Sequence, residues 1–195
     1  MKWSEAESDG TDRTRDAMHL ACIYGWINRN KWEQERYGCK IDKSPFPESS
    51  DLVCDQMEAS QIIRAMNSQP KPICHWLHHA YGDMQAPDWT WHGRRVAYAL
   101  WVRAFPEKRD ETNYQLIWMA LQDFRQRMLG RPPTSEEVLQ AGMGGKKWAW
   151  FKLWKPKFED TIDQLQAWDV CGVAHVSITV KAIREGRDQS SNGTG

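Results

Sequence analysis

The sequence of 195 residues lacks the motifs by which common enzyme classes are identified. It contains no Gly-x-Ser-x-Gly, no Walker loop, no His-Glu-x-x-His and no glycine-rich dinucleotide motif. Its apolar runs are only a few residues long, so no membrane span is predicted. The acidic segment 1–10 has no apolar core of a signal peptide. Together these absences favour a cytoplasmic binding protein that is not an enzyme.

The cysteines show neither pairing nor metal-site spacing. They are odd in number, without any Cys-x-x-Cys, which predicts reduced thiols: Cys22, Cys39, Cys54, Cys74 and Cys171. A histidine-rich stretch with possible metal ligands consists of Cys74, His75, His78 and His79, followed later by His92. A structural zinc site needs four ligands, usually with paired cysteines, so we predict no metal and no cofactor. A nuclease site formed by Asp83, Asp88 and His92 is the weaker alternative.

The chain also has no formal net charge, because 26 basic residues balance 26 acidic ones. The balance is local, however: residues 131–157 carry 6 bases and 2 acids, and residues 158–195 carry 3 bases and 6 acids. A basic segment in a neutral chain predicts one directed anionic partner. Tryptophan is abundant, with 12 residues. Most of these rings are expected in the core, and the rest are expected to stack on bases or to anchor a protein interface.

Apolar residues recur at helical spacing almost throughout, which predicts an all-α protein of several helices with helix-turn-helix-like hairpins. Helices are expected over residues 15–37, 55–66, 72–81, 110–129, 134–141, 146–154 and 158–168, and a further one is expected to begin at Trp89 or His92 and to end at Phe105. Pro156 is expected to stop or kink the helix before it. Residues 170–183 are rich in β-branched side chains, so a helix and a strand pair are both possible, and a helix is favoured.

Four regions follow from this pattern. Residues 1–14 are expected to be a flexible N-terminus and residues 15–130 a helical domain. Residues 131–185 are expected to form a helix-turn-helix-like basic segment with a C-terminal helix, and residues 186–195 a flexible tail. Arg131-Pro-Pro133 marks the boundary between the two structured regions.

The basic segment fits a helix-turn-helix register that begins at Thr134. Positions 5, 10, 15 and 18 must be apolar and face inward, and they are Val138, Met143, Trp148 and Phe151. Position 9, where a positive φ is common, is Gly142. The run Thr134-Ser-Glu-Glu137 predicts a capping box that opens the first helix. The alternative is a structural αα-hairpin whose lysines are only solvated.

In this register the second helix would be the recognition helix and would face a polyanion. Thr134 would offer its hydroxyl or backbone N–H to a phosphate, and Trp150 would pack on a sugar or a thymine methyl. The predicted nucleic-acid contacts are Thr134, Lys146, Lys147, Trp150, Lys152, Lys155 and Lys157, with Arg94 and Arg95 in a second basic element over residues 89–97. Arg, Gln and Asn, which read bases with two hydrogen bonds, are missing from this helix. The residues that determine DNA sequence specificity are therefore expected elsewhere in the chain.

Three stretches carry a resemblance to a known family: Val53-Cys-Asp-Gln-Met-Glu-Ala-Ser-Gln-Ile-Ile-Arg-Ala-Met66, Pro72-Ile-Cys-His-Trp-Leu-His-His-Ala-Tyr-Gly82 and Trp26-Ile-Asn-Arg-Asn-Lys-Trp32. With the basic segment downstream, the chain resembles the bacteriophage late-gene antiterminators of the Q type. The resemblance implies binding to DNA near a late promoter and loading onto a paused host RNA polymerase in the bacterial cytoplasm. Transcription would then pass terminators.

A second function stays open at this point. A phage-encoded inhibitor of a host protein, such as an anti-CRISPR or a polymerase inhibitor, would also use exposed lysines and tryptophans. In that case the lysines would block or imitate a nucleic-acid surface, and the tryptophans would anchor the interface. The DNA site and the oligomeric state do not follow from the sequence.

Overall fold

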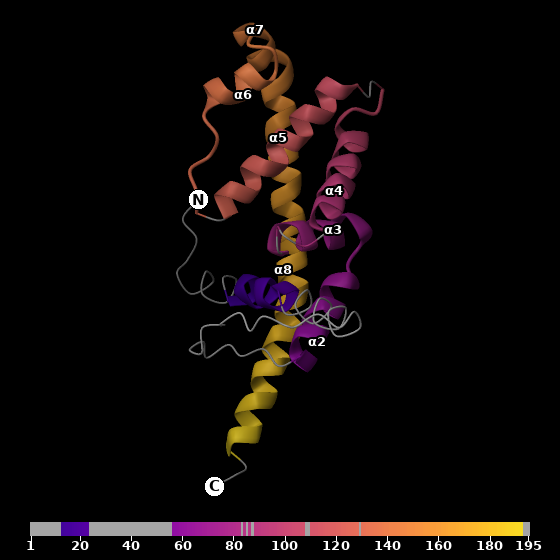
Figure 1. Cartoon of the computed structure of the whole chain (residues 1–195), viewed down its shortest axis with the longest axis vertical. Helices are drawn as coiled ribbons and strands as arrows, with labels where there is room; N and C mark the ends of the chain where they lie inside the picture. The colour runs from indigo at the N-terminus through magenta and orange to yellow at the C-terminus, as the bar shows by residue number, and fades with distance from the viewer. Residues whose placement is uncertain are drawn as a thin grey trace, which may run out of the picture. The chain divides into compact units, whose positions relative to one another are not determined.

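The computed structural model describes residues 13–23, 56–82, 84, 86, 88–107, 110–128 and 130–192, and every regular element within these ranges is helical. The predicted all-α fold is confirmed. The chain divides into two compact units, and Figure 1 labels the helices α2 to α8 that they contain. Unit 1 comprises residues 1–70, 81–89 and 171–195, and unit 2 comprises residues 71–80 and 90–170. The predicted four-region division stays a prediction.

The helices follow the predicted order closely. After a helix over residues 13–23 come α2 (Gln56–Asn67), α3 (Lys71–Tyr81), α4 (Trp89–Ala104), α5 (Glu111–Met128), α6 (Glu136–Gly142), α7 (Lys147–Ala149), the π-helical turn η1 (Trp150–Trp154) and α8 (Lys155–Asn192). Residues 24–55 lie outside the described ranges. They include the predicted helix end at Tyr37-Gly38, the loop 41–50 and the segment 26–32. In the part of the chain that the structure describes, no helix combines the length and hydropathy needed to cross a membrane.

The last two predicted segments form one helix, α8. The helix favoured over residues 170–183 is confirmed, and Val173, Val176 and Val180 make its buried stripe at helical spacing. Pro156 does not stop the helix, because η1 comes directly before it. A proline ring clashes with the carbonyl four residues earlier in a regular α-helix, and the wider π-helical turn lies where that clash would occur.

The core of unit 2 is built around Trp76 on α3. Its side chain is fully buried, and its ring centroid lies 5.4 Å from that of Phe124 on α5. Its indole Nε1–H donates a hydrogen bond of 3.2 Å to Oδ1 of Asp169, which is itself buried on α8. One side chain therefore ties three helices together through both apolar and polar contacts.

Helix α4 approaches α3 closely at Gly93. A Cβ atom at this position would lie 2.7 Å from Cε1 of the buried His79. Such a distance is far below van der Waals contact, so only glycine lets the two helices pack this way. Further along, the rings of Trp101 on α4 and Tyr114 on α5 meet edge to face at 5.4 Å. These contacts fix the framework that carries α6 and α7.

Unit 1 has its own buried residues. Met18, Ile62, Met66 and Val176 are buried, and they come from the helix over 13–23, from α2 and from α8. Tyr81 connects the end of α3 to the helix over residues 13–23, because its hydroxyl accepts a hydrogen bond of 3.2 Å from Nε of Arg15. Its carbonyl oxygen also lies 2.9 Å from Nδ1 of His19.

Candidate nucleic-acid interface

The connection from α5 to α6 is fixed by a buried carboxylate. Asp123 Oδ1 accepts a hydrogen bond of 2.6 Å from the backbone N–H of Thr134, and Asp123 Oδ2 pairs with Arg127 at 2.6 Å. Thr134 is thereby held outside the helix. Ser135 takes the N-cap position without a side-chain hydrogen bond, so the predicted capping box is wrong. Since the backbone N–H of Thr134 is donated to Asp123, only its half-buried hydroxyl stays available to a phosphate.

The predicted helix-turn-helix register is also wrong. Of its inward positions only Met143 is buried, whereas Val138, Trp148 and Phe151 are 59%, 65% and 42% exposed. The positive φ values fall at Gly144 (90°) and Gly145 (73°), not at Gly142. Gly142 is required for another reason: a Cβ atom there would lie 2.8 Å from Cε of Met119 on α5. The turn is thus displaced by two residues from the predicted position.

Trp150 faces the core, whereas the predicted helix-turn-helix register places Trp148 and Phe151 there. Its side chain is 2% exposed, its ring lies 5.8 Å from that of Phe158, and its Nε1–H donates a hydrogen bond of 3.0 Å to Oε1 of Glu136. The predicted outward orientation of Trp150 is therefore wrong. This ring anchors η1 to α6 and to the start of α8.

Two of the predicted lysines are engaged within the fold. Lys155 Nζ donates a hydrogen bond of 2.8 Å to Oε1 of Glu136. Lys157 Nζ donates one of 3.1 Å to the carbonyl oxygen of Ala104, and it lies 5.6 Å from the ring centroid of Phe105. Both ammonium groups are therefore held by contacts within the chain.

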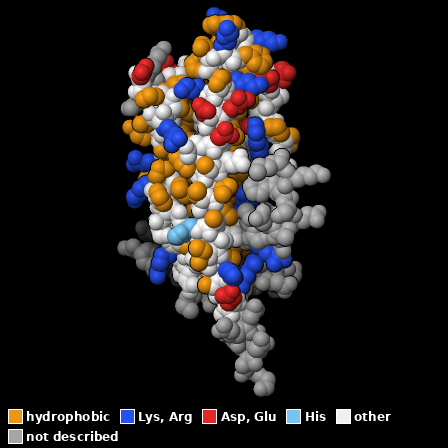
Figure 2. All heavy atoms as spheres, turned by 180° about the vertical axis from the view of Figure 1, so that it is seen from behind, with side chains coloured by type: hydrophobic (Ala, Val, Ile, Leu, Met, Phe, Trp, Pro, Cys, Tyr) orange, Lys and Arg blue, Asp and Glu red, His pale blue; other side chains and the backbone are white. Residues whose placement is uncertain are grey.

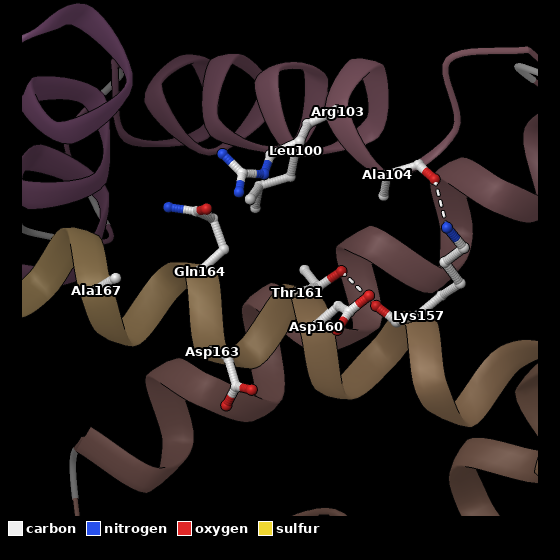
Figure 3. Close-up of a pocket in the computed structure, with 9 residues that line it drawn as sticks. All are labelled: Leu100, Arg103, Ala104, Lys157, Asp160, Thr161, Asp163, Gln164 and Ala167. Carbon is white, nitrogen blue, oxygen red and sulfur yellow. Dashed lines mark hydrogen bonds between the residues drawn. The ribbon is translucent and has the colours of Figure 1, made fainter.

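Lys157 also lines a cavity of about 430 Å³ between α4 and α8. Figure 3 shows Lys157 reaching toward Ala104, while Arg103 and Gln164 extend into the same space from opposite helices. The lining includes Asp160 and Asp163 as well. Because acidic and basic side chains mix here, this cavity does not fit a polyanion.

The remaining cations make an outward surface, which we call the cationic-aromatic face: Lys146, Lys147, Trp148, Phe151 and Lys152. All five side chains are exposed. Within the described ranges, none of its three lysines has an ion pair or hydrogen bond to a carboxylate. No acidic residue occurs between Val138 and Phe158. Figure 2 shows Lys and Arg beside hydrophobic side chains at the end of unit 2 that carries α7.

Arg94 and Arg95 are exposed on α4 but face different neighbours. Arg94 lines a cavity of about 370 Å³ together with Gln115 of α5, and Gln115 Nε2 donates a hydrogen bond of 3.2 Å to the carbonyl oxygen of Gly142. Arg94 is thus linked through one residue to the turn before Lys146. Arg95 instead lies 5.2 Å from the ring centroid of Trp91. The structure therefore does not bring both arginines together.

The histidine-rich stretch forms a cluster that the sequence did not predict in this form. His75 Nδ1 lies 3.0 Å from His92 Nδ1, and the His78 and His92 rings stack at 4.7 Å. Burial, followed by Lys71 and Arg95, lowers the pKa of His75. Among the described residues no group of three or more His, Cys, Asp or Glu side chains could hold a metal ion. Asp83, from the weaker nuclease alternative, lies outside the described residues.

The Glu136 carboxylate gives a prediction about pH. Its hydrogen bonds from Lys155 and then from Trp150 lower its pKa. A lowered pKa means that the stabilisation is fully present above the unfolded-state pKa and is lost as pH falls through the folded-state pKa. We therefore expect the protection factors of the α6 amides, which correct for the intrinsic pH dependence of exchange, to fall in the wild type as pH drops from neutral through the folded-state pKa of Glu136.

The matched variants are Glu136→Gln and Glu137→Gln on the same helix. The first should exchange faster than the wild type already at neutral pH, because the charged contacts to Lys155 and Trp150 are weakened. The second should behave as the wild type, since Glu137 is exposed. Equal exchange in Glu136→Gln and the wild type at neutral pH would show that this carboxylate does not anchor η1.

A comparison with protein families agrees with the resemblance seen in the sequence. Residues 38–192, most of the chain and including α2 to α8, match the model of phage antitermination protein Q. No curated protein and no solved structure matches the chain. The predicted resemblance to Q-type antiterminators is confirmed. The chain belongs to the phage antitermination protein Q family and is a phage regulator of transcription.

Proposed function

We propose that this chain is a late-gene antitermination factor that contacts duplex DNA through the cationic-aromatic face and acts on host RNA polymerase. The observation that carries the proposal is the exposure of Lys146, Lys147 and Lys152 on a stretch without acids. Family membership supports antitermination as the regulatory role. The proposal assigns no catalytic residue and places the protein in the cytoplasm of the bacterial host.

Lysine on this face suits the DNA backbone better than the bases. Each lysine that neutralises a phosphate releases a counterion and makes the slope of log affinity against log salt more negative by about 0.9. The face carries no Arg, Gln or Asn that could form paired hydrogen bonds with one base. We therefore assign it to positioning on DNA, while Arg94, linked to the same turn through Gln115, extends the positive surface.

The polymerase contact is assigned to apolar surface outside the lysines. Val138 on α6 is 59% exposed and Leu153 on η1 is 51% exposed. Exposed apolar side chains next to a polar rim are typical of protein interfaces. This arrangement would let the same end of unit 2 hold DNA and a protein together.

The exposed indole of Trp148 supports one rival, an inhibitor that occupies a host protein. Two measurements separate the functions: binding of the purified chain to labelled duplex DNA at low salt, and capture of host proteins from a nuclease-treated lysate. An antitermination factor binds DNA by itself and also captures RNA polymerase. Capture of a host protein without any affinity for DNA would favour the inhibitor and contradict the proposal.

A further inference from the structure

We infer that Trp148 and Phe151 stack on unpaired bases, so that the cationic-aromatic face binds single-stranded DNA in addition to the duplex backbone. The inference rests on the proposed function, because it assumes that the lysines of this face meet a DNA backbone. It adds a second kind of contact, in which the base itself is held by a ring.

The orientation of Trp148 follows from its buried neighbour. Trp150 is held inside by Glu136 and Phe158, and residues two positions apart on a helix point to nearly opposite sides. Trp148 is therefore directed to solvent and is 65% exposed. A large ring exposed in this way presents its π surface to a stacking partner.

Phe151 extends the same surface. It follows Trp148 by three residues, across the junction of α7 and η1, and both residues are exposed. Lys155 Nζ lies 5.2 Å from the centroid of the Phe151 ring, and the same ammonium group is tied to Glu136. The ring is thus braced by a fixed cation and remains 42% exposed.

The rings are surrounded by cations. Lys147 is adjacent to Trp148 in the sequence, Lys152 follows it by four residues, and both lysines are exposed. Before them, Gly144 and Gly145 have open space where a Cβ would stand, with nothing within 4 Å. A basic track with stacking rings and an unobstructed approach is the pattern of single-strand binding surfaces.

A duplex cannot use this surface fully, because the faces of paired bases are covered by their neighbours in the stack. A protein partner fits less well too, since the sequence neighbours of Trp148 on this side are lysines. Charge complementarity and the exposed rings therefore favour an unpaired strand.

The test measures fluorescence anisotropy of four labelled probes of equal length at one salt concentration: a dT strand, an abasic DNA strand, an rU strand and a duplex. Stacking on bases contributes about 1–3 kcal/mol per base. We therefore expect the wild type to bind the dT strand at least about tenfold more tightly than the abasic strand.

Three variants sharpen the comparison. Trp148→Ala should lose about tenfold for the dT strand and nothing for the abasic strand, because only base contacts are removed. Trp148→Phe should keep most of the affinity, since a ring remains. Trp91→Ala, which removes an exposed tryptophan from α4, should bind all probes as the wild type does.

Several results would overturn the inference. These are equal affinity of the wild type for dT and abasic strands, an unchanged dT affinity in Trp148→Ala, or binding of rU tenfold tighter than dT. Loss of polymerase capture in Trp148→Ala with strand affinity kept would make the ring a protein anchor instead. The proposed function would still hold after any of these results if the wild type binds duplex DNA and Lys147→Glu weakens that binding. No DNA binding at low salt would overturn both.

Discussion

Charge reversal of Lys146, Lys147 and Lys152 to Glu is expected to lower the affinity for duplex DNA by at least about a hundredfold at low salt. Each substitution removes one cation and puts an anion beside the phosphates, so attraction becomes repulsion. The melting temperature should stay unchanged, because all three side chains are exposed and pair with no described carboxylate. A gel shift at low salt and a thermal melt measure the two effects.

Lys181→Glu serves as the matched control for a single substitution, Lys147→Glu. Lys181 is exposed on α8, in unit 1, and has only a weak contact of 3.8 Å to Glu185. Both variants change the net charge equally, so a general charge effect would weaken DNA binding in both. A loss confined to Lys147→Glu places the contact on the cationic-aromatic face. If the triple variant kept full affinity for duplex DNA, the cationic-aromatic face would not be the DNA-binding surface.

Trp76→Ala is expected to destabilise the protein by about 3–5 kcal/mol, the range typical of a buried tryptophan replaced by alanine. The substitution removes the ring contact with Phe124 and the hydrogen bond to Asp169, and it leaves a cavity among three helices. Urea unfolding followed by circular dichroism measures the change. Trp148→Ala removes the same side chain from the surface, and its effect should stay within about 0.5 kcal/mol.

Trp76→Phe separates the two contributions of this side chain. A phenyl ring keeps most of the apolar contact but has no N–H for Asp169, so we expect a smaller loss than with alanine. If Trp76→Ala and Trp148→Ala had equal effects on unfolding, the described core of unit 2 would be wrong.

Helix existence can be predicted from the sequence because it depends on a local, repeating pattern. Apolar residues such as Ile62 and Met66, and breakers such as Gly82, set the ends of α2 and α3 within a few residues. The helical state of residues 170–183 follows from the same periodicity, although their β-branched side chains also suit strands.

The orientation of the aromatic residues is not predictable in the same way. Trp148 and Trp150 both fit an apolar helix position, and the sequence alone does not say which of them meets Glu136. The π-helical turn η1 adds to the difficulty, because it shifts the helical phase of α7 relative to α8. A register counted at 3.6 residues per turn therefore places Trp150 outward and Phe151 inward, opposite to the structure.

The engagement of individual lysines depends on partners distant in the sequence. Lys155 is 19 residues from Glu136, and Lys157 is 53 residues from Ala104. Local composition indicates neither pairing, so the sequence does not show which lysines of the basic segment are engaged within the fold. The structure divides the segment into an outward group at Lys146, Lys147 and Lys152 and an inward group that holds the fold together.

The salt dependence of duplex binding tests the central claim most directly. We predict that the slope of log affinity against log salt is more negative in the wild type, by about 2.7, than in a variant with Lys146, Lys147 and Lys152 changed to Ala, or about 0.9 for each phosphate that one of these lysines neutralises. Equal slopes and equal affinities for the two proteins would contradict the assignment of DNA to the cationic-aromatic face.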